Sequence, residues 1–208
     1  MEAKMSFYLQ GLAIGLAYVA PIGMQNLFVI NTALSQGKKR TFQTAAIIVF
    51  FDISLSLACF FGIGAVIAAL PWLEKIVLCV GSLVVIWIGI GLIRAKAELS
   101  NDADVAVPLL KVATTAFVVT WINPQALIDG TMLLGACRAD LPAGSELPFV
   151  LGFASASIIW FFGISVLITL FSAKITGKLL KLINIVCGIV MIFYGLKLFW
   201  SFISPFLG

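Results

Sequence analysis

Long apolar runs separated by short polar links fill the chain from one end to the other. Six of these runs reach the length that an α-helix needs to cross a bilayer, about 20 residues. They lie near residues 6–32, 42–70, 74–94, 111–137, 147–172 and 179–203. The pattern predicts an all-α integral membrane protein in which six transmembrane helices form one transmembrane domain over residues 1–208.

Two of the six runs contain helix breakers. Pro21 lies in the first run and Pro124 in the fourth, and each proline removes one backbone donor from the helical ladder. Gly23 loosens the first run further. Asn123 is pushed away from helical dihedrals by the proline that follows it, and its side chain can cap a new helix that begins there. We expect the first and fourth helices to be discontinuous at Pro21 and at Asn123–Pro124.

The two halves of the chain, about 6–94 and 111–203, resemble each other. Ser54 aligns with Ser155, and the sequence F-F-G-I occurs in both halves a few residues later. Three spans in each half would turn the second copy upside down relative to the first. Inverted repeats with discontinuous helices at matching positions are typical of transporters, whose sites lie near the membrane midplane.

Composition supports the assignment to the membrane and excludes several kinds of chemistry. Of 208 residues, 62% are hydrophobic, 11% are charged and none is histidine, whereas a soluble domain has about a quarter charged residues. The net charge of +4 is spread between apolar runs, which does not indicate a nucleic-acid-binding face. The cysteines are far apart, which disfavours thiol-redox and zinc sites; they are Cys59, Cys79, Cys137 and Cys187. We expect no enzymatic activity, no metal and no cofactor.

The lysines and arginines predict how the chain is oriented. Nine of them lie in or beside the links that follow the first, third and fifth predicted helices, and four lie elsewhere. This bias places the first, third and fifth links in the cytoplasm and both termini outside. The first link contains Lys38, Lys39 and Arg40, and the third mixes basic residues with acids. The main competing topology has an inside N-terminus and five spans, with one segment re-entrant.

Two acids lie well inside the predicted spans, Asp52 in the second and Asp129 in the fourth. A charged carboxylate facing lipid costs about 2.5–3.5 kcal/mol, and intramembrane acids usually mark transport pathways. No lysine or arginine lies at a comparable depth. The structural alternative is a protonated acid that is hydrogen-bonded across helices.

The polar side chains near the breaks complete a candidate ligand site. Gln25 and Asn26 provide amides at the first break, and free backbone amides at the start of each half-helix suit a carboxylate. The two aspartates suit a cation or protons. A basic amino acid has a carboxylate for the backbone amides and a cationic end for the aspartates. Other polar residues either line a path or bond to their own helices; these are Tyr18, Thr120, Ser155 and Ser157. Gly11 and Gly15 are expected to serve close packing inside one subunit.

Several motifs resemble the LysE family of amino acid exporters. The resemblance covers essentially the whole chain and rests on S-F-Y-L-Q-G-L-A-I-G (6–15), P-I-G-M-Q-N (21–26), F-F-D-I-S (50–54), T-W-I-N-P-Q-A-L-I-D (120–129) and A-S-I-I-W-F-F-G (156–163). It implies a multi-pass secondary active exporter of arginine, lysine or related amino acids in the bacterial cytoplasmic membrane. The membrane potential or the proton gradient would drive the export.

The resemblance also assigns roles to individual residues. The family's membrane aspartates fall on Asp52 and Asp129, and its asparagine–proline pair falls on Asn123 and Pro124. One departure lies at Met24, where the family often has a second proline; the resemblance therefore supports a role for Pro21 to Asn26 less strongly than one for the fourth helix.

Three alternatives to basic amino acid export remain open. The first is an exporter of neutral amino acids or other small metabolites, in which the aspartates serve only proton coupling. The second is a membrane thiol-disulfide carrier, which needs a paired, reactive cysteine couple. The third is a purely structural membrane subunit. The oligomeric state is also open.

Overall fold

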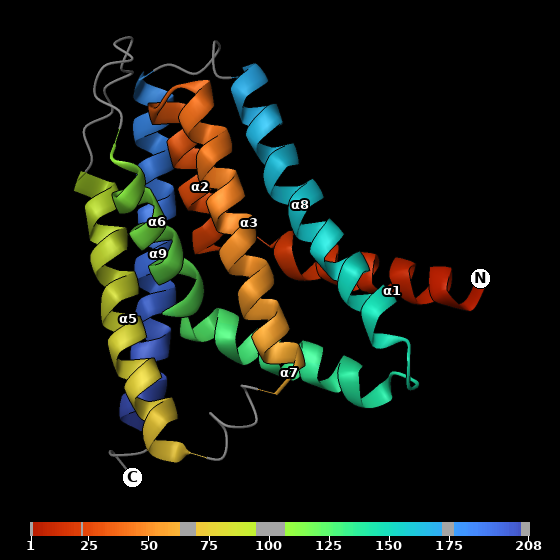
Figure 1. Ribbon diagram of the computed structural model, residues 1–208. Coiled ribbons are helices and arrows are strands. Elements are labelled where there is room, and N and C mark those ends of the chain that lie inside the picture. Colours follow the sequence, from red (N-terminus) through yellow and green to blue (C-terminus); the bar gives the residue numbers. More distant parts are fainter. Residues whose placement is uncertain (1, 22, 63–69, 95–106, 172–176, 205–208) are drawn as a thin grey trace.

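The computed structural model describes residues 2–21, 23–62, 70–94, 107–171 and 177–204, which form eight α-helices and no strand (Figure 1). The helices are α1 (Glu2–Val19), α2 (Met24–Ser35), α3 (Lys38–Phe60), α5 (Pro71–Arg94), α6 (Leu109–Trp121), α7 (Pro124–Asp140), α8 (Glu146–Phe171) and α9 (Gly177–Ile203).

The helices follow the six predicted apolar segments, with two segments split as expected. The first segment divides into α1 and α2, which meet at an angle of 73°. The fourth divides into α6 and α7, with α7 beginning at Pro124. The other four segments correspond to α3, α5, α8 and α9.

The second segment is shorter than predicted. We expected it to reach residue 70, but α3 ends at Phe60, and Gly62 then turns the chain with a positive φ of 102°. A positive φ suits glycine because other residues clash there. Residues 63–69 of this prediction lie outside the described chain.

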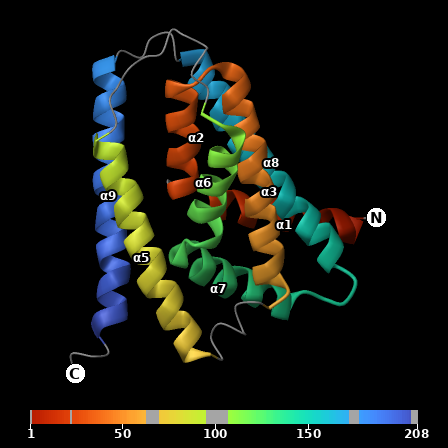
Figure 2. The ribbon, with the colours of Figure 1, turned by 60° about the vertical axis from the view of Figure 1, so that its left-hand side comes forward.

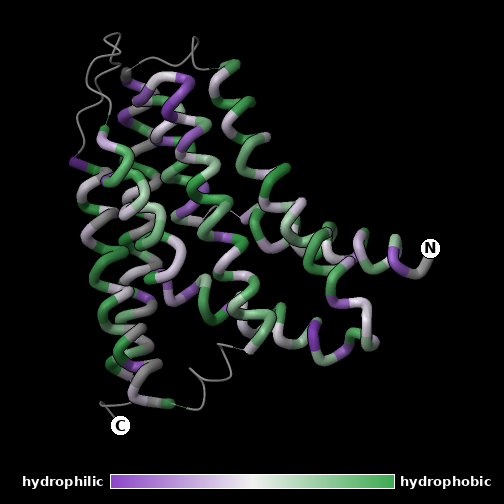
Figure 3. Tube along the Cα trace, in the orientation of Figure 1, coloured by the Kyte–Doolittle hydropathy of each residue, from purple (hydrophilic) through white to green (hydrophobic). Residues whose placement is uncertain are grey.

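Helix length and hydropathy identify candidate membrane spans among the described residues. α3 and α8 are each long and apolar enough to cross a bilayer, and α1 with α2 qualifies as one bent span. α6 is shorter. Apolar residues follow most of the helices in Figure 3, and large apolar side chains such as Leu110, Trp87 and Met132 are exposed. Such an outer surface suits contact with lipid.

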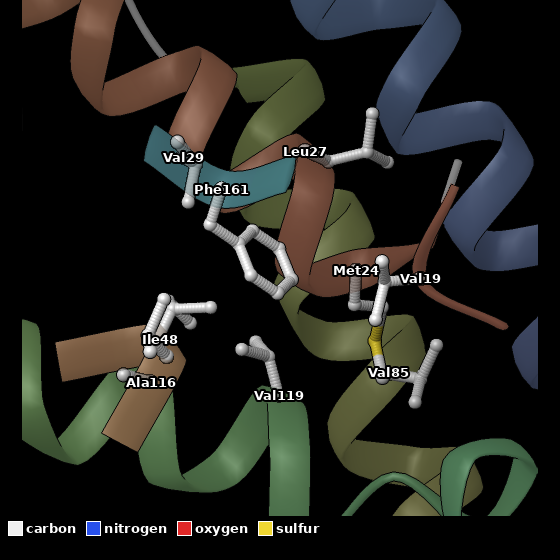
Figure 4. Close-up of a cluster of buried hydrophobic side chains, with 10 residues drawn as sticks. Val19, Met24, Leu27, Val29, Ile48, Val85, Ala116, Val119 and Phe161 are labelled. Atoms are coloured by element: carbon white, nitrogen blue, oxygen red, sulfur yellow. The ribbon is translucent and has the colours of Figure 1, made fainter. Parts of the chain in front are cut away.

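The bundle is organised around α3, which packs against α2, α6, α7 and α8. α5 and α9 lie side by side as a pair, and α1 crosses α8 (Figures 1 and 2). Buried apolar residues fill the space between α2, α3, α6 and α8. In Figure 4, Phe161 of α8 projects toward Ile48 of α3 and Val119 of α6.

Glycines allow the backbones of α1 and α8 to touch. A Cβ atom on Gly11 would collide with the carbonyl oxygen of Phe149, and one on Gly152 would collide with that of Tyr8. Gly15 faces the same helix, with its hypothetical Cβ 3.1 Å from the Cα of Phe153. The prediction that Gly11 and Gly15 serve packing inside one subunit is therefore confirmed.

The helix ends that flank the three basic links lie at the same end of the bundle. These are the C-terminal ends of α2, α5 and α8 and the N-terminal ends of α3, α6 and α9, all toward the top of Figure 1. α9 runs from this end of the bundle to the opposite end, where it ends at Ile203.

Candidate functional site

Asp52 is buried near the middle of α3 and is held by two neighbouring helices. Its side chain is 1% exposed. Oδ1 accepts a hydrogen bond from Gln25 Nε2 of α2 at 3.1 Å, and Oδ2 accepts one from Ser157 Oγ of α8 at 2.6 Å. No lysine or arginine of the described chain pairs with this carboxyl group. A buried acid that has polar partners but no counter-ion is what a cationic ligand or an exchangeable proton requires.

Gln25 extends this arrangement to a fourth helix. Its Nε2 also donates to Thr120 Oγ1 of α6 at 3.1 Å. Thr120 and Ser157 are both fully buried. We call Gln25, Asp52, Thr120 and Ser157 the Asp52 cluster. Ser157 therefore contacts the carboxyl group directly, and Thr120 is joined to it through Gln25.

Asn26 closes the first helix break. Its Nδ2 donates to the carbonyl oxygens of Val19 at 3.0 Å and Pro21 at 2.8 Å, which the break leaves without helical partners. Its Oδ1 accepts a hydrogen bond from Trp160 Nε1 of α8 at 2.8 Å. Asn26 thus uses both ends of its amide to hold the break. The sequence interpretation missed Trp160, although an indole N–H inside an apolar helix signals a need for an acceptor.

The start of α2 is open at the same break. Gly23 is the N-cap residue, in an extended conformation, and no side chain caps the first turn of α2 among the described residues. Pro21 and Gly23 are exposed. The first backbone N–H groups of a helix have no helical partner and attract anions. This half-helix therefore offers a docking point for a carboxylate.

The second break has the predicted local structure. Asn123 caps α7 by accepting a hydrogen bond from the backbone N–H of Gln125 at 3.2 Å, and Pro124 begins the helix. Pro124 is buried against α5. A Cβ atom on Gly81 would lie 2.6 Å from Pro124 Cδ and 2.7 Å from the carbonyl oxygen of Ile122. Because Gly81 has no side chain, α5 packs directly against the break between α6 and α7 and braces it. The sequence did not suggest this contact.

Asp129 lies outside the Asp52 cluster. It is exposed on α7 and accepts a hydrogen bond from the side chain of Gln125, one turn earlier. Tyr18 of α1 lies between α7 and α8, with its ring against that of Phe153. The Tyr18 hydroxyl donates to the carbonyl oxygen of Ala126 at 3.0 Å.

The described cysteines do not form a redox or metal site. Cys59, Cys79 and Cys137 are free thiols, and the side chain of Cys187 lies outside the described part of the chain. The described residues contain no group of cysteines and acids that could hold a metal ion.

Comparisons with known proteins agree over nearly the whole chain. Residues 16–201 match the family model described as LysE type translocator. The chain is 34% identical over 200 residues to the arginine exporter protein ArgO of Shigella flexneri, and equally to that of Escherichia coli strain K12, covering 93% of each chain in both cases. It is 34% identical over 193 residues to the arginine exporter protein ArgO of Salmonella schwarzengrund, covering 89% of this chain and 90% of the relative. No solved structure matches.

Proposed function

The chain belongs to the LysE family of translocators, and on this premise we propose that it is a secondary active exporter of basic amino acids, arginine or lysine, in the bacterial cytoplasmic membrane. It is a transporter and not an enzyme. Its relatives are named as arginine exporters, which favours arginine as the substrate.

The observation that carries the proposal is the buried carboxyl group of Asp52. It accepts hydrogen bonds from Gln25 and Ser157 and has no cationic partner among the described residues. A guanidinium or ammonium group is a suitable counter-ion. Protons would compete with it for the same carboxyl group, which supplies a route to proton coupling.

The helix breaks supply the complementary half of the site. The uncapped first turn of α2, at Pro21 and Gly23, would hold the α-carboxylate of the substrate, since free amides and the positive end of the helix dipole favour anions. The start of α7, at Asn123 and Pro124, is the equivalent position in the second half. Asp129 is the second acid, for substrate or protons.

The helix pairing supports an inverted repeat with alternating access. In such a repeat, α1 corresponds to α6, α2 to α7, α3 to α8 and α5 to α9. The contact of α2 with α8 then corresponds to the contact of α7 with α3. The contacts of α3 with α8 and of α5 with α9 each join two corresponding helices, one from each half. We infer that the two halves rock about the Asp52 cluster.

The orientation proposed for the membrane has the basic links in the cytoplasm and both termini outside. The clustering of the helix ends that flank these links supports one cytoplasmic end.

Efflux of labelled arginine from cells tests the proposed export. We expect Asp52→Asn and Asp129→Asn each to lower the rate at least tenfold with normal amounts of protein in the membrane. Arginine efflux at the wild-type rate in both variants would contradict a role for the aspartates in transport.

The second candidate is an exporter of neutral amino acids. Competition by unlabelled arginine, lysine, threonine and leucine against one labelled substrate separates the two candidates. We expect arginine and lysine to compete, and competition by threonine or leucine alone would favour the second candidate.

A further inference from the structure

Two buried side chains of α3 and one partly buried side chain, that of Arg40, contain shielded polar atoms that no described residue satisfies. Arg40 Nε and Nη1, Thr44 Oγ1 and Ser56 Oγ are shielded from solvent, and none has a hydrogen-bond partner in the part of the chain that the structure describes. Thr44 is fully buried, and Ser56 is 6% exposed. Buried polar groups without partners are rare, because each loses its hydration and gains nothing in return. The gathering of three on one helix indicates a function.

These groups lie before and after Asp52 along α3. Arg40 and Thr44 are four residues apart, as are Asp52 and Ser56, a spacing that makes the members of each pair neighbours on the helix surface. Arg40 lies in the first turn of α3, at the end of the bundle with the basic links. It precedes Asp52 by twelve residues, which is about 18 Å along a helix. This separation is longer than an extended arginine molecule.

The chemistry of Arg40 and Thr44 suits a carboxylate. A guanidinium is permanently charged, and its planar fork matches the two oxygens of a carboxylate. Thr44 lies one turn further into the helix and offers a hydroxyl donor. Lys38 and Lys39 are exposed beside Arg40, and the first turns of α3 and α6 contain no acid.

We propose that Arg40 and Thr44 form a carboxylate site at the cytoplasmic end of α3. This site binds the α-carboxylate of the substrate before the cationic end of the same molecule reaches Asp52. It rests on the proposed export of basic amino acids and adds a second binding step to it. Because the donor atoms are shielded in this structure, the cytoplasmic end must open before the substrate reaches them.

Ser56 lies one turn beyond Asp52 on α3. It lines a small, mostly apolar cavity between α3, α7 and α8, among Phe60, Phe149 and Phe153. The cavity has room for about one water molecule. Unsatisfied polar groups thus lie on α3 both before and after Asp52.

Uptake of labelled arginine into everted membrane vesicles tests the carboxylate site, because such vesicles expose the cytoplasmic face. Unlabelled arginine and argininamide, which lacks the carboxylate, serve as competitors. We define the carboxylate preference as the concentration of argininamide that halves uptake divided by the concentration of unlabelled arginine that halves uptake. We expect Arg40→Gln to lower this preference about tenfold and Thr44→Val to lower it about threefold, the effects of losing a charged and a neutral hydrogen bond.

Lys39→Gln is the matched control, because it removes an exposed positive charge from the adjacent position and should leave the preference unchanged. An unchanged preference in both Arg40→Gln and Thr44→Val overturns the proposal. The proposal is also overturned if the triple variant Glu98→Gln, Asp102→Asn, Asp104→Asn lowers the preference as far as Arg40→Gln does, because the guanidinium would then serve these acids of the third link. Absence of arginine uptake by the wild type would instead overturn the proposed function.

Discussion

At the scale of single residues, hydrogen bonds between distant parts of the chain define the centre of the molecule. Ser157 lies 105 residues from Asp52 in sequence, and their hydrogen bond of 2.6 Å joins α8 to α3. Gln25 joins α2 and α6 to the same carboxyl group. Each neutral partner stabilises the carboxylate without neutralising it, so the group stays available to a cation.

Removal of the Ser157 hydroxyl tests this arrangement. We expect Ser157→Ala to lower arginine efflux about tenfold, because a hydrogen bond to a charged group contributes about 1.5–3 kcal/mol. Ser155→Ala, two residues away on α8, is the control, since Ser155 bonds Tyr8 and its own helix. Equal efflux by the two variants would contradict a special role for Ser157.

Removal of the Trp160 indole N–H tests the first break. Trp160→Phe leaves Asn26 Oδ1 without its donor, and we expect a loss of stability of about 1–3 kcal/mol. Thermal unfolding in detergent measures this loss, with the exposed Trp72 as the control in Trp72→Phe. A melting temperature unchanged by Trp160→Phe would show that Asn26 does not depend on this contact.

At the scale of helices, glycines set the distances between elements. Gly89 and Gly188 bring α5 and α9 together, with a hypothetical Cβ on Gly89 only 2.9 Å from the carbonyl oxygen of Gly188. Gly81 brings α5 against the break between α6 and α7. A broken helix that is braced in this way can bend at one place without losing its position in the bundle.

Substitution of Gly81 tests the brace. Gly81→Ala places a methyl group against the ring of Pro124 and the carbonyl oxygen of Ile122. We expect reduced transport and a lower melting temperature, because a proline ring and a carbonyl group are held by the backbone and cannot move aside easily. Gly91→Ala on the same helix is the control, since nothing lies within 4 Å of its hypothetical Cβ. Gly91→Ala should be neutral or stabilising by up to about 1 kcal/mol. Equal stability of the two variants would contradict the brace.

The helices and both breaks could be predicted from sequence because their causes are local. Pro124 and Asn123 start a helix through their own dihedrals and one capping hydrogen bond. The contact of Gly81 with Pro124 could not be predicted, since a glycine in an apolar helix has no local signature of its partner. The environment of Asp129 also required the structure, because the sequence placed it in a span but did not indicate which side of the helix it occupies.

At the scale of the whole molecule, the described helices pack so that α3 and α8 form the centre and the α5–α9 pair lies to one side, against α2 and α7. The basic links lie at one end of this arrangement. The Asp52 cluster draws a residue from each of four helices, so relative motion of the two halves would change it directly. The proposed rocking of the two halves would in this way let one buried carboxyl group respond to both sides of the membrane.

Arginine transport by purified protein in proteoliposomes, with imposed pH gradients and membrane potentials, tests the central claim most directly. The account predicts arginine transport driven by at least one gradient in the wild type, its loss in Asp52→Asn, and its retention in Asp140→Asn, which neutralises an exposed acid at the end of α7. Transport by Asp52→Asn at the rate of the wild type would contradict the account.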